Sequence, residues 1–190
     1  MRRRYLNPVH RIQYGSRMEV VDGFARLFTR ALKGDPSALT TIGTLLTYKV
    51  GFGSASELAV ACYAAAARFG DVSAKYNLAS ALLEGTGVRK DVPAGVRLLR
   101  EAYRNGNMEA ANYLGYCYWK GIGVTKDLRK AFALNSEAAR SRVASAQYAV
   151  GTALLNGNGV EKNASKGLRW ITKAAGNGDA EAQRFLARKR

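Results

Sequence analysis

Three short stretches combine glycine with basic residues in a way that would suit a phosphate-binding loop. They read GTGVRKD from Gly85, GIGVTKD from Gly121 and GNGVEKN from Gly157. A loop that wraps a phosphate follows a strand and usually ends in Gly-Lys-Ser/Thr, because backbone N–H groups and the lysine hold the anion together. Neither the strand pattern nor that ending is present, so we interpret the three stretches as structural joints.

Acid/base, nucleophilic and metal chemistry have few candidate residues. His10 is the only histidine, and the chain has two cysteines, Cys62 and Cys117, each on an apolar helical background. No nucleophile with a base, no acid/base pair and no zinc ligand set can be assembled from these residues. We therefore predict no catalytic residue, no metal site and no cofactor. We expect both cysteines to be buried thiols and not a disulfide.

The three stretches recur every 36 residues, and the chain around them repeats with the same period. A constant period of this size indicates stacked supersecondary units. Within a unit, apolar residues recur at helical spacing before and after the glycines, which predicts two amphipathic helices. We expect units at 35–70, 71–106, 107–142 and 143–178, and the first is degenerate because its glycines lie two residues late.

Aspartate and asparagine mark the expected helix starts, since their side-chain oxygens accept N–H groups that the helix leaves unpaired. Val143 occupies that position in the fourth unit, so the helix that follows it should have the loosest start. The glycines at Gly85, Gly121 and Gly157 stand where a residue with positive φ ends a helix. The predicted caps are Asp35, Asp71, Asn107 and Asp179 for the first helices and Asp91, Asp127 and Asn163 for the second helices.

The repeated pattern A-x-Y-x-L-A/G-x-x-L/Y-x-x-G-x-G-V-x-K-D/N resembles the Sel-one-like repeat family, whose units are α/α solenoid elements related to tetratricopeptide repeats. The resemblance is close over 71–178 and partial over 35–70. It implies a superhelix of antiparallel helix pairs that acts as an adaptor or scaffold and not as a catalyst. Two residues depart from the pattern: Asn112 replaces a tyrosine, and Arg142 replaces the glycine that closes the other units.

We accordingly predict an all-α fold, a right-handed α/α solenoid of about four helix-pair repeats with flanking capping helices. One helix pair cannot bury its apolar stripe, whereas stacked pairs form a continuous core and the terminal ones need polar caps. The expected layout is a basic N-terminal tail at 1–17 and a single solenoid domain at 18–190. That domain includes an N-terminal capping helix at 18–34 and a C-terminal capping helix at 179–190.

The chain has a formal net charge of +16, from 30 Lys and Arg against 14 Asp and Glu. The excess lies mainly in the N-terminal segment and in the third and fourth units, and it predicts attraction to something acidic. An acidic protein is the leading hypothesis, and an inhibitor or immunity partner of a bacterial effector is a more specific form that the family resemblance implies. The alternative is a nucleic-acid-binding adaptor that uses the Arg- and Tyr-rich tail.

The sequence has no apolar stretch of about 18 residues and no secretory signal pattern, so we expect a cytoplasmic protein without membrane insertion. Its oligomeric state stays open.

The first helices carry a row of residues that differs between units and lies opposite the buried stripe. In related solenoids the first helices line a concave groove, and the resemblance makes this row the candidate site for a partner. Its aromatic residues stand where other units have Asn, Ser and Thr. They either are exposed in the groove or pack against the next repeat, and the sequence does not choose between these arrangements. The predicted partner-binding residues are Tyr48, Glu84, Tyr113, Tyr116, Trp119, Lys120 and Arg188.

Overall fold

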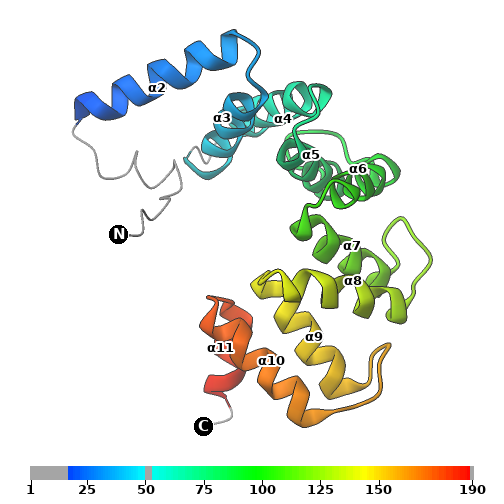
Figure 1. The fold of residues 1–190 in the computed structure, drawn as a ribbon. Coiled ribbons are helices and arrows are strands. Elements are labelled where there is room, and N and C mark those ends of the chain that lie inside the picture. Colours follow the sequence, from blue (N-terminus) through cyan, green and yellow to red (C-terminus); the bar gives the residue numbers. More distant parts are fainter. Residues whose placement is uncertain (1–16, 50–52, 189–190) are drawn as a thin grey trace.

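In a computed structural model the chain forms a curved row of helices (Figure 1). The structure describes residues 17–49 and 53–188, without the side chains at 17–22, 24, 48–49 and 53–55. Within those ranges there are ten α-helices and no strand, so the predicted all-α solenoid is confirmed. The helices are α2 (Arg17–Leu32), α3 (Pro36–Lys49), α4 (Gly53–Arg68), α5 (Val72–Glu84), α6 (Val92–Arg104), α7 (Met108–Lys120), α8 (Leu128–Arg140), α9 (Ala144–Asn156), α10 (Ala164–Gly176) and α11 (Ala180–Ala187).

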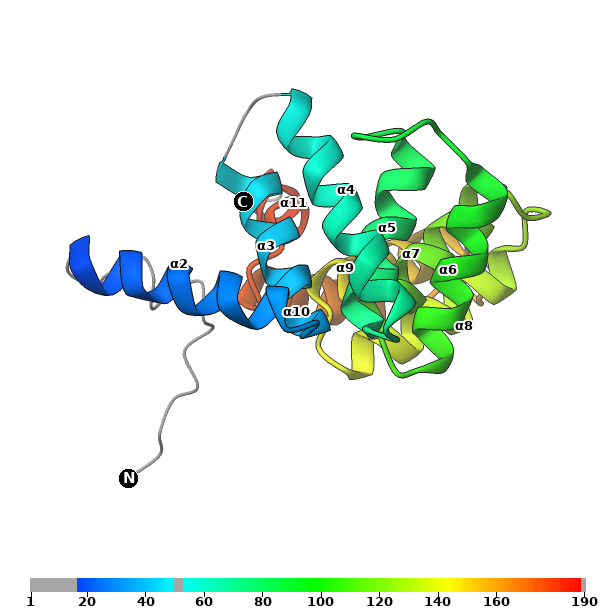
Figure 2. The ribbon, with the colours of Figure 1, turned by 90° about the horizontal axis from the view of Figure 1, so that it is seen from above.

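The helices pack in sequential pairs, α3 with α4, α5 with α6, α7 with α8, and α9 with α10. Each pair contacts the next through the second helix of one and the first helix of the other. The pairs follow an arc whose two ends, at α3 and α11, lie on the same side of the molecule (Figure 1). Figure 2 shows α2 reaching away from this stack, which it contacts through α3.

The 36-residue period is visible in the helix bounds. Helices α5, α7 and α9 each have 13 residues, as do α6, α8 and α10. Every predicted cap accepts a hydrogen bond from a backbone N–H in the first turn, as Asp71 does from Ala74 at 2.7 Å. Val143 makes no such bond, as expected from its side chain.

The glycines after the first helices have the left-handed conformation predicted for them. Gly85, Gly121 and Gly157 have φ of 80°, 81° and 78°, and the N–H of each bonds to a carbonyl four residues earlier. The glycine two residues further on has a second role that the sequence did not indicate. A Cβ on Gly123 would lie 2.7 Å from Val92 Cγ1, so this loop packs directly on the second helix of the preceding repeat.

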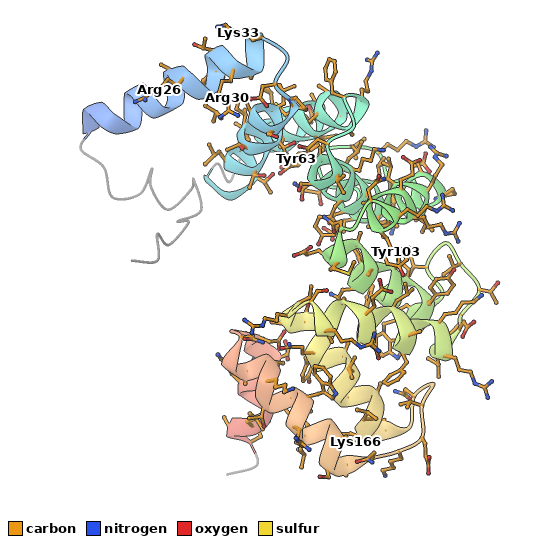
Figure 3. The ribbon with its side chains drawn as sticks, viewed as in Figure 1. Arg26, Arg30, Lys33, Tyr63, Tyr103 and Lys166 are labelled. Carbon is orange, nitrogen blue, oxygen red and sulfur yellow. The ribbon has the colours of Figure 1, made fainter. Side chains whose placement is uncertain are left out.

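One position in each pair forms the centre of its packing. A side chain from the second helix lies against a glycine or alanine of the first helix, so that the two backbones approach closely. Leu99 and Ile171 are fully buried at this position, and Ile171 meets Gly151. In the first pair this position is occupied by Tyr63, which lies against Gly43 (Figure 3). The Tyr63 hydroxyl lies 3.2 Å from Thr47 Oγ1.

Both cysteines are thiols in the structure. Cys117 is fully buried, as predicted, whereas Cys62 is only partly buried. Burial raises the pKa of Cys117 to about 11 and also raises the pKa of Cys62, because a low-dielectric environment disfavours the thiolate. Both groups are therefore protonated at neutral pH.

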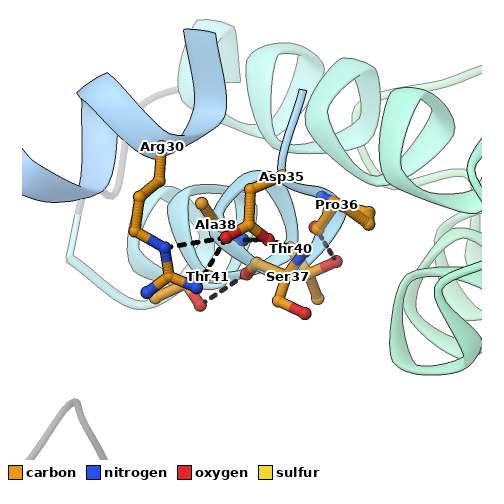
Figure 4. A network of polar contacts seen from close by, with 7 residues as sticks. All are labelled: Arg30, Asp35, Pro36, Ser37, Ala38, Thr40 and Thr41. Carbon is orange, nitrogen blue, oxygen red and sulfur yellow. Dashed lines mark hydrogen bonds and ion pairs between the residues drawn. The ribbon is translucent and has the colours of Figure 1, made fainter. Parts of the chain in front are cut away.

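A polar junction joins α2 to α3 (Figure 4). Arg30 Nε donates to Asp35 Oδ2 at 2.7 Å, and the other carboxylate oxygen accepts from the N–H of Ser37 at 3.0 Å. These bonds, that to Arg30 first, hold the pKa of Asp35 below its usual value. Asp35 thus caps the start of α3 and, through its bond to Arg30, also holds the end of α2.

Among the described helices, none is long and apolar enough to cross a membrane.

Candidate partner-binding groove

A pocket of about 640 Å³ opens between α7, α8 and α9, with single residues of α5 and α11 at its edge. Three of its aromatic side chains come from one face of α7. The ring centroids of Tyr113 and Tyr116 are 6.1 Å apart, and those of Tyr116 and Trp119 are 5.9 Å apart. Phe132 of α8 and Tyr148 of α9 line the pocket from the other helices. Two adjacent repeats thus form a pocket whose wall is rich in aromatic side chains.

The sequence left open whether the aromatic residues of α7 are exposed in the groove or packed against a neighbouring repeat, and both arrangements occur. Tyr116 and Trp119 are 43% and 41% exposed, which is high for large apolar side chains. Tyr113 is partly buried and also bridges to the preceding repeat, since its hydroxyl donates to Glu84 Oε1 at 3.0 Å. Burial first, and then the bond to Glu84, raise the pKa of Tyr113 above its usual value.

The remaining predicted residues lie outside the pocket lining. Lys120 is exposed with its Nζ 4.3 Å from the Trp119 ring centroid, a cation–π contact at the edge of the site. Glu84 reaches the pocket only through Tyr113, and Arg188 is an exposed residue at the end of α11. The side chain of Tyr48 lies outside the described residues. The structure therefore brings Tyr113, Tyr116 and Trp119 together, and not the whole predicted set.

None of the asparagines that line the pocket was among the predicted site residues, and two of them depart from the repeat pattern. Asn112 stands at the position that Tyr76 and Tyr148 occupy in neighbouring repeats, and its shorter side chain leaves room between their rings. Its Nδ2 donates to Ser145 Oγ at 2.8 Å. Asn135, on α8, also lines the pocket. A signal for both was present, because each breaks the pattern when the repeats are aligned at 36 residues.

The charge of the pocket differs from that of the chain. No lysine or arginine is found in its lining, which is formed wholly by described residues, and Glu181 is its only charged side chain. That carboxylate already accepts from Arg184 Nη2 at 2.6 Å. The pocket interior is thus close to neutral in a chain of net charge +16.

A basic cluster lies instead on the second helix of the last pair. Lys166, Arg169 and Lys173 surround Trp170 at a shallow hollow of about 200 Å³, and Lys173 Nζ is 4.8 Å from the Trp170 ring centroid. Figure 3 shows Lys166 pointing away from the helix pairs. Lys173 stands where α8 has Glu137, which accepts a hydrogen bond from Tyr103 at 2.6 Å. The last pair therefore has a cation where another repeat has a partnered acid.

A protein-family model described as Sel1 repeat matches residues 72–107, 109–141 and 144–179, together more than half of the chain. The chain belongs to the Sel1 repeat family. Sel1 repeat proteins generally mediate protein–protein interactions, and their fold is typically a non-catalytic scaffold. The matched segments coincide with the pairs α5 to α10, which include the pocket helices.

Solved structures of other Sel1 repeat proteins share the fold. A Sel1 repeat protein from Oxalobacter formigenes is 27% identical, with a TM-score of 0.77 over 87% of this chain and 68% of that one. The protective antigen c5321 of uropathogenic Escherichia coli, described as displaying an SLR fold, is 25% identical with a TM-score of 0.71 over 85% of this chain. The present chain covers 34% of that protein. A search of curated proteins finds no match.

Proposed function

We propose that this Sel1 repeat protein is a non-catalytic scaffold that holds a segment of a partner protein in the pocket between α7, α8 and α9. The observation that supports this proposal is the exposure of Tyr116 and Trp119 beside a cavity of about 640 Å³. Large aromatic side chains bury much apolar area at little conformational cost, and they dominate the binding energy of many interfaces. A partner segment that fills the pocket removes this surface from water.

We propose that the acidic part of the partner contacts a surface outside the pocket. The pocket offers no cation to a carboxylate, whereas Lys166, Arg169 and Lys173 form a basic row on α10. An overall positive field raises the rate at which an acidic protein arrives, and it contributes less to the affinity of the final complex. We therefore place the acidic part of the partner against α10 and its apolar part in the pocket.

Three finer hypotheses about function and location rest on the sequence alone. The nucleic-acid alternative depends on the basic tail, and residues 1–16 lie outside the described part of the chain. The role of inhibitor or immunity partner for a bacterial effector rests on the family resemblance. The cytoplasmic location rests on the sequence pattern of the N-terminus.

The test is capture of the partner from native cells by the tagged full-length chain, followed by measurement of its affinity. Replacing Tyr116 and Trp119 together by alanine should weaken binding by about 2 kcal/mol or more, the usual effect of central aromatic residues. Phe69 is 66% exposed and does not line the pocket, so Phe69→Ala is a matched control that should bind normally. Thermal unfolding of all variants should stay close to that of the parent.

Two results would contradict the proposal. Unchanged partner binding by the double variant, with unchanged unfolding, would exclude the pocket as the binding site. Loss of the captured material after nuclease treatment would instead favour the nucleic-acid alternative, and deletion of 1–16 should then abolish capture.

A further inference from the structure

The pocket contains a polar side chain that the fold does not use. Asn135 is 8% exposed and lines the pocket, and its Oδ1 is buried without a hydrogen-bond partner. Buried polar atoms in folded proteins are nearly always paired, so an unpaired amide beside a cavity calls for an explanation. Ser136 Oγ is the other such atom in the described part of the chain, but Ser136 does not line the pocket.

The repeats show what the fold itself favours at this position. Asn135 is equivalent to Leu99 and Ile171, which are both fully buried, and each lies at the centre of its helix pair. Tyr63, the other polar residue at the position, has its hydroxyl within reach of Thr47 and Thr44. Asn135 has Gly115 opposite it, which offers no side chain to bond. Packing alone therefore gives no reason for an amide in this repeat.

The amide can complement a hydrogen-bonding group that enters from the pocket. Rotation about χ2 exchanges Oδ1 and Nδ2, so Asn135 can present either an acceptor or a donor to an occupant. The walls around it are aromatic, with Phe132 and Tyr148 facing the α7 rings. Such a site suits a side chain with a flat apolar body and one polar atom at its tip.

Charge excludes the other amphipathic side chains. A carboxylate would be buried without a cation, since no lysine or arginine lines the pocket. A guanidinium would stack well on the rings, but the single carboxylate of the lining, Glu181, is already paired with Arg184. A phenylalanine would leave the amide of Asn135 unpaired. A tyrosine or tryptophan side chain brings a flat apolar ring for the aromatic residues of the lining and one uncharged polar atom for the amide of Asn135.

We infer that the pocket takes a tyrosine or tryptophan side chain of the partner, and that Asn135 selects it by hydrogen bonding to the phenol hydroxyl or the indole N–H. This inference rests on the proposed function, because it names the side chain that occupies the same pocket. Asn135 would then act as the specificity-determining residue of the groove, while the α7 aromatics supply most of the contact area.

In the experiment, the full-length chain is titrated with each of four small probes. Binding is measured from the NMR signals of its backbone amides. The probes are p-cresol and 3-methylindole for the proposed side chains, toluene for phenylalanine and N-ethylguanidinium for arginine. We expect p-cresol and 3-methylindole to bind about five-fold or more tightly than toluene, the ratio that one net hydrogen bond gives. The amide signal of Gly115, which adjoins Asn135, should be among those that shift.

Asn135→Leu restores the residue type of the equivalent positions and should fold at least as stably as the parent. In this variant the preference should reverse, with toluene bound more tightly than p-cresol. Asn135→Ala serves as a second variant that cannot overfill the site, and it should abolish the preference without reversing it. A double variant of Tyr116 and Trp119, each replaced by alanine, should lose the binding of p-cresol, 3-methylindole and toluene.

Several outcomes would overturn the inference. The inference is contradicted if the parent binds p-cresol and toluene equally, binds N-ethylguanidinium most tightly, or binds no probe at all. An unchanged preference in both Asn135 variants also contradicts it. These failures are separable from failure of the proposed function. If the aromatic double variant loses the partner while the Asn135 variants keep it, the groove is the binding site and the selected side chain is wrong.

Discussion

Arg142 is the position where one substitution should make the protein more stable. It is the only residue other than glycine with positive φ in the described part of the chain, at 66°, and it ends the third repeat where Gly106 and Gly178 end others. For a residue with a Cβ, this left-handed conformation costs about 1–2 kcal/mol of free energy. Glycine avoids that strain but adds about 0.4–1 kcal/mol of unfolded-state freedom. Arg142→Gly should therefore raise the free energy of unfolding by about 0.5–1 kcal/mol.

The side chain of Arg142 should contribute little to this balance. It is exposed, and among the described residues it has no hydrogen bond or ion pair, while its backbone N–H bonds to the carbonyl of Ala139 at 3.1 Å in either variant. For a chain of this length the expected rise in midpoint is about 1–4 °C, measured by thermal and urea unfolding monitored by circular dichroism. Because repeat arrays need not unfold in two states, the two methods should be compared.

Two control variants separate backbone strain from charge. Arg142→Ala removes the same positive charge from a chain of +16 but keeps a Cβ at positive φ, so it should give no comparable gain. Gly106→Arg creates the strain at an equivalent position, where φ is 86° and a Cβ would meet nothing within 4 Å. By the same balance of strain and unfolded-state freedom, it should lower the free energy of unfolding by about 0.5–1 kcal/mol. Equal stabilisation by Arg142→Ala and Arg142→Gly would refute the reasoning and assign the effect to charge.

Three further predictions test the joints and the core. Val143→Thr keeps the branched shape and adds a capping hydroxyl to α9, so it should raise the free energy of unfolding in urea by about 0.5–1 kcal/mol. Gly159→Ala drives a Cβ into the backbone of α8 and should cost about 1–3 kcal/mol, clearly more than Gly157→Ala, whose Cβ would have no neighbour closer than 3.7 Å. With its pKa raised to about 11 by burial, Cys117 should resist a thiol reagent at pH 8 until the protein unfolds, whereas the partly exposed Cys62 should react first; simultaneous reaction would show that α7 opens readily.

Much of the fold was predictable because the information is local and repeated. Asp71 and Asn107 act as caps through bonds to residues three positions away, and Gly121 ends α7 through its own conformation. Such features depend on neighbours in sequence, and the 36-residue period displays each of them several times. The contact of the second glycine with the preceding repeat was not predictable in this way, because it joins residues about 30 positions apart.

The candidate site was less predictable, since it depends on side-chain directions across three helices. The alignment singled out Tyr113 and Tyr116, but it could not show that Tyr113 is held by Glu84 while Tyr116 stays exposed. It also placed the row on the first helices alone, whereas Phe132 and Asn135 enter the pocket from α8. The net charge predicted attraction to an acidic partner but not where the cations lie, and in the structure Lys166, Arg169 and Lys173 lie together on α10, outside the pocket.

Three departures from the repeat pattern, at Asn112, Asn135 and Arg142, fall in one unit, 107–142, and two of them have a stability cost. Arg142 is strained, and the unpaired amide of Asn135 costs about 1–3 kcal/mol relative to an apolar residue. In a solenoid the stability of one unit adds to that of its neighbours through their shared interfaces, so α5–α6 and α9–α10 can hold this weaker unit in place. Strain at Arg142 follows from a single lost glycine and touches no cavity. The polar change at Asn135 and the shortened side chain at Asn112 both open onto the same pocket, and local costs that converge on one cavity are the pattern expected of a binding site.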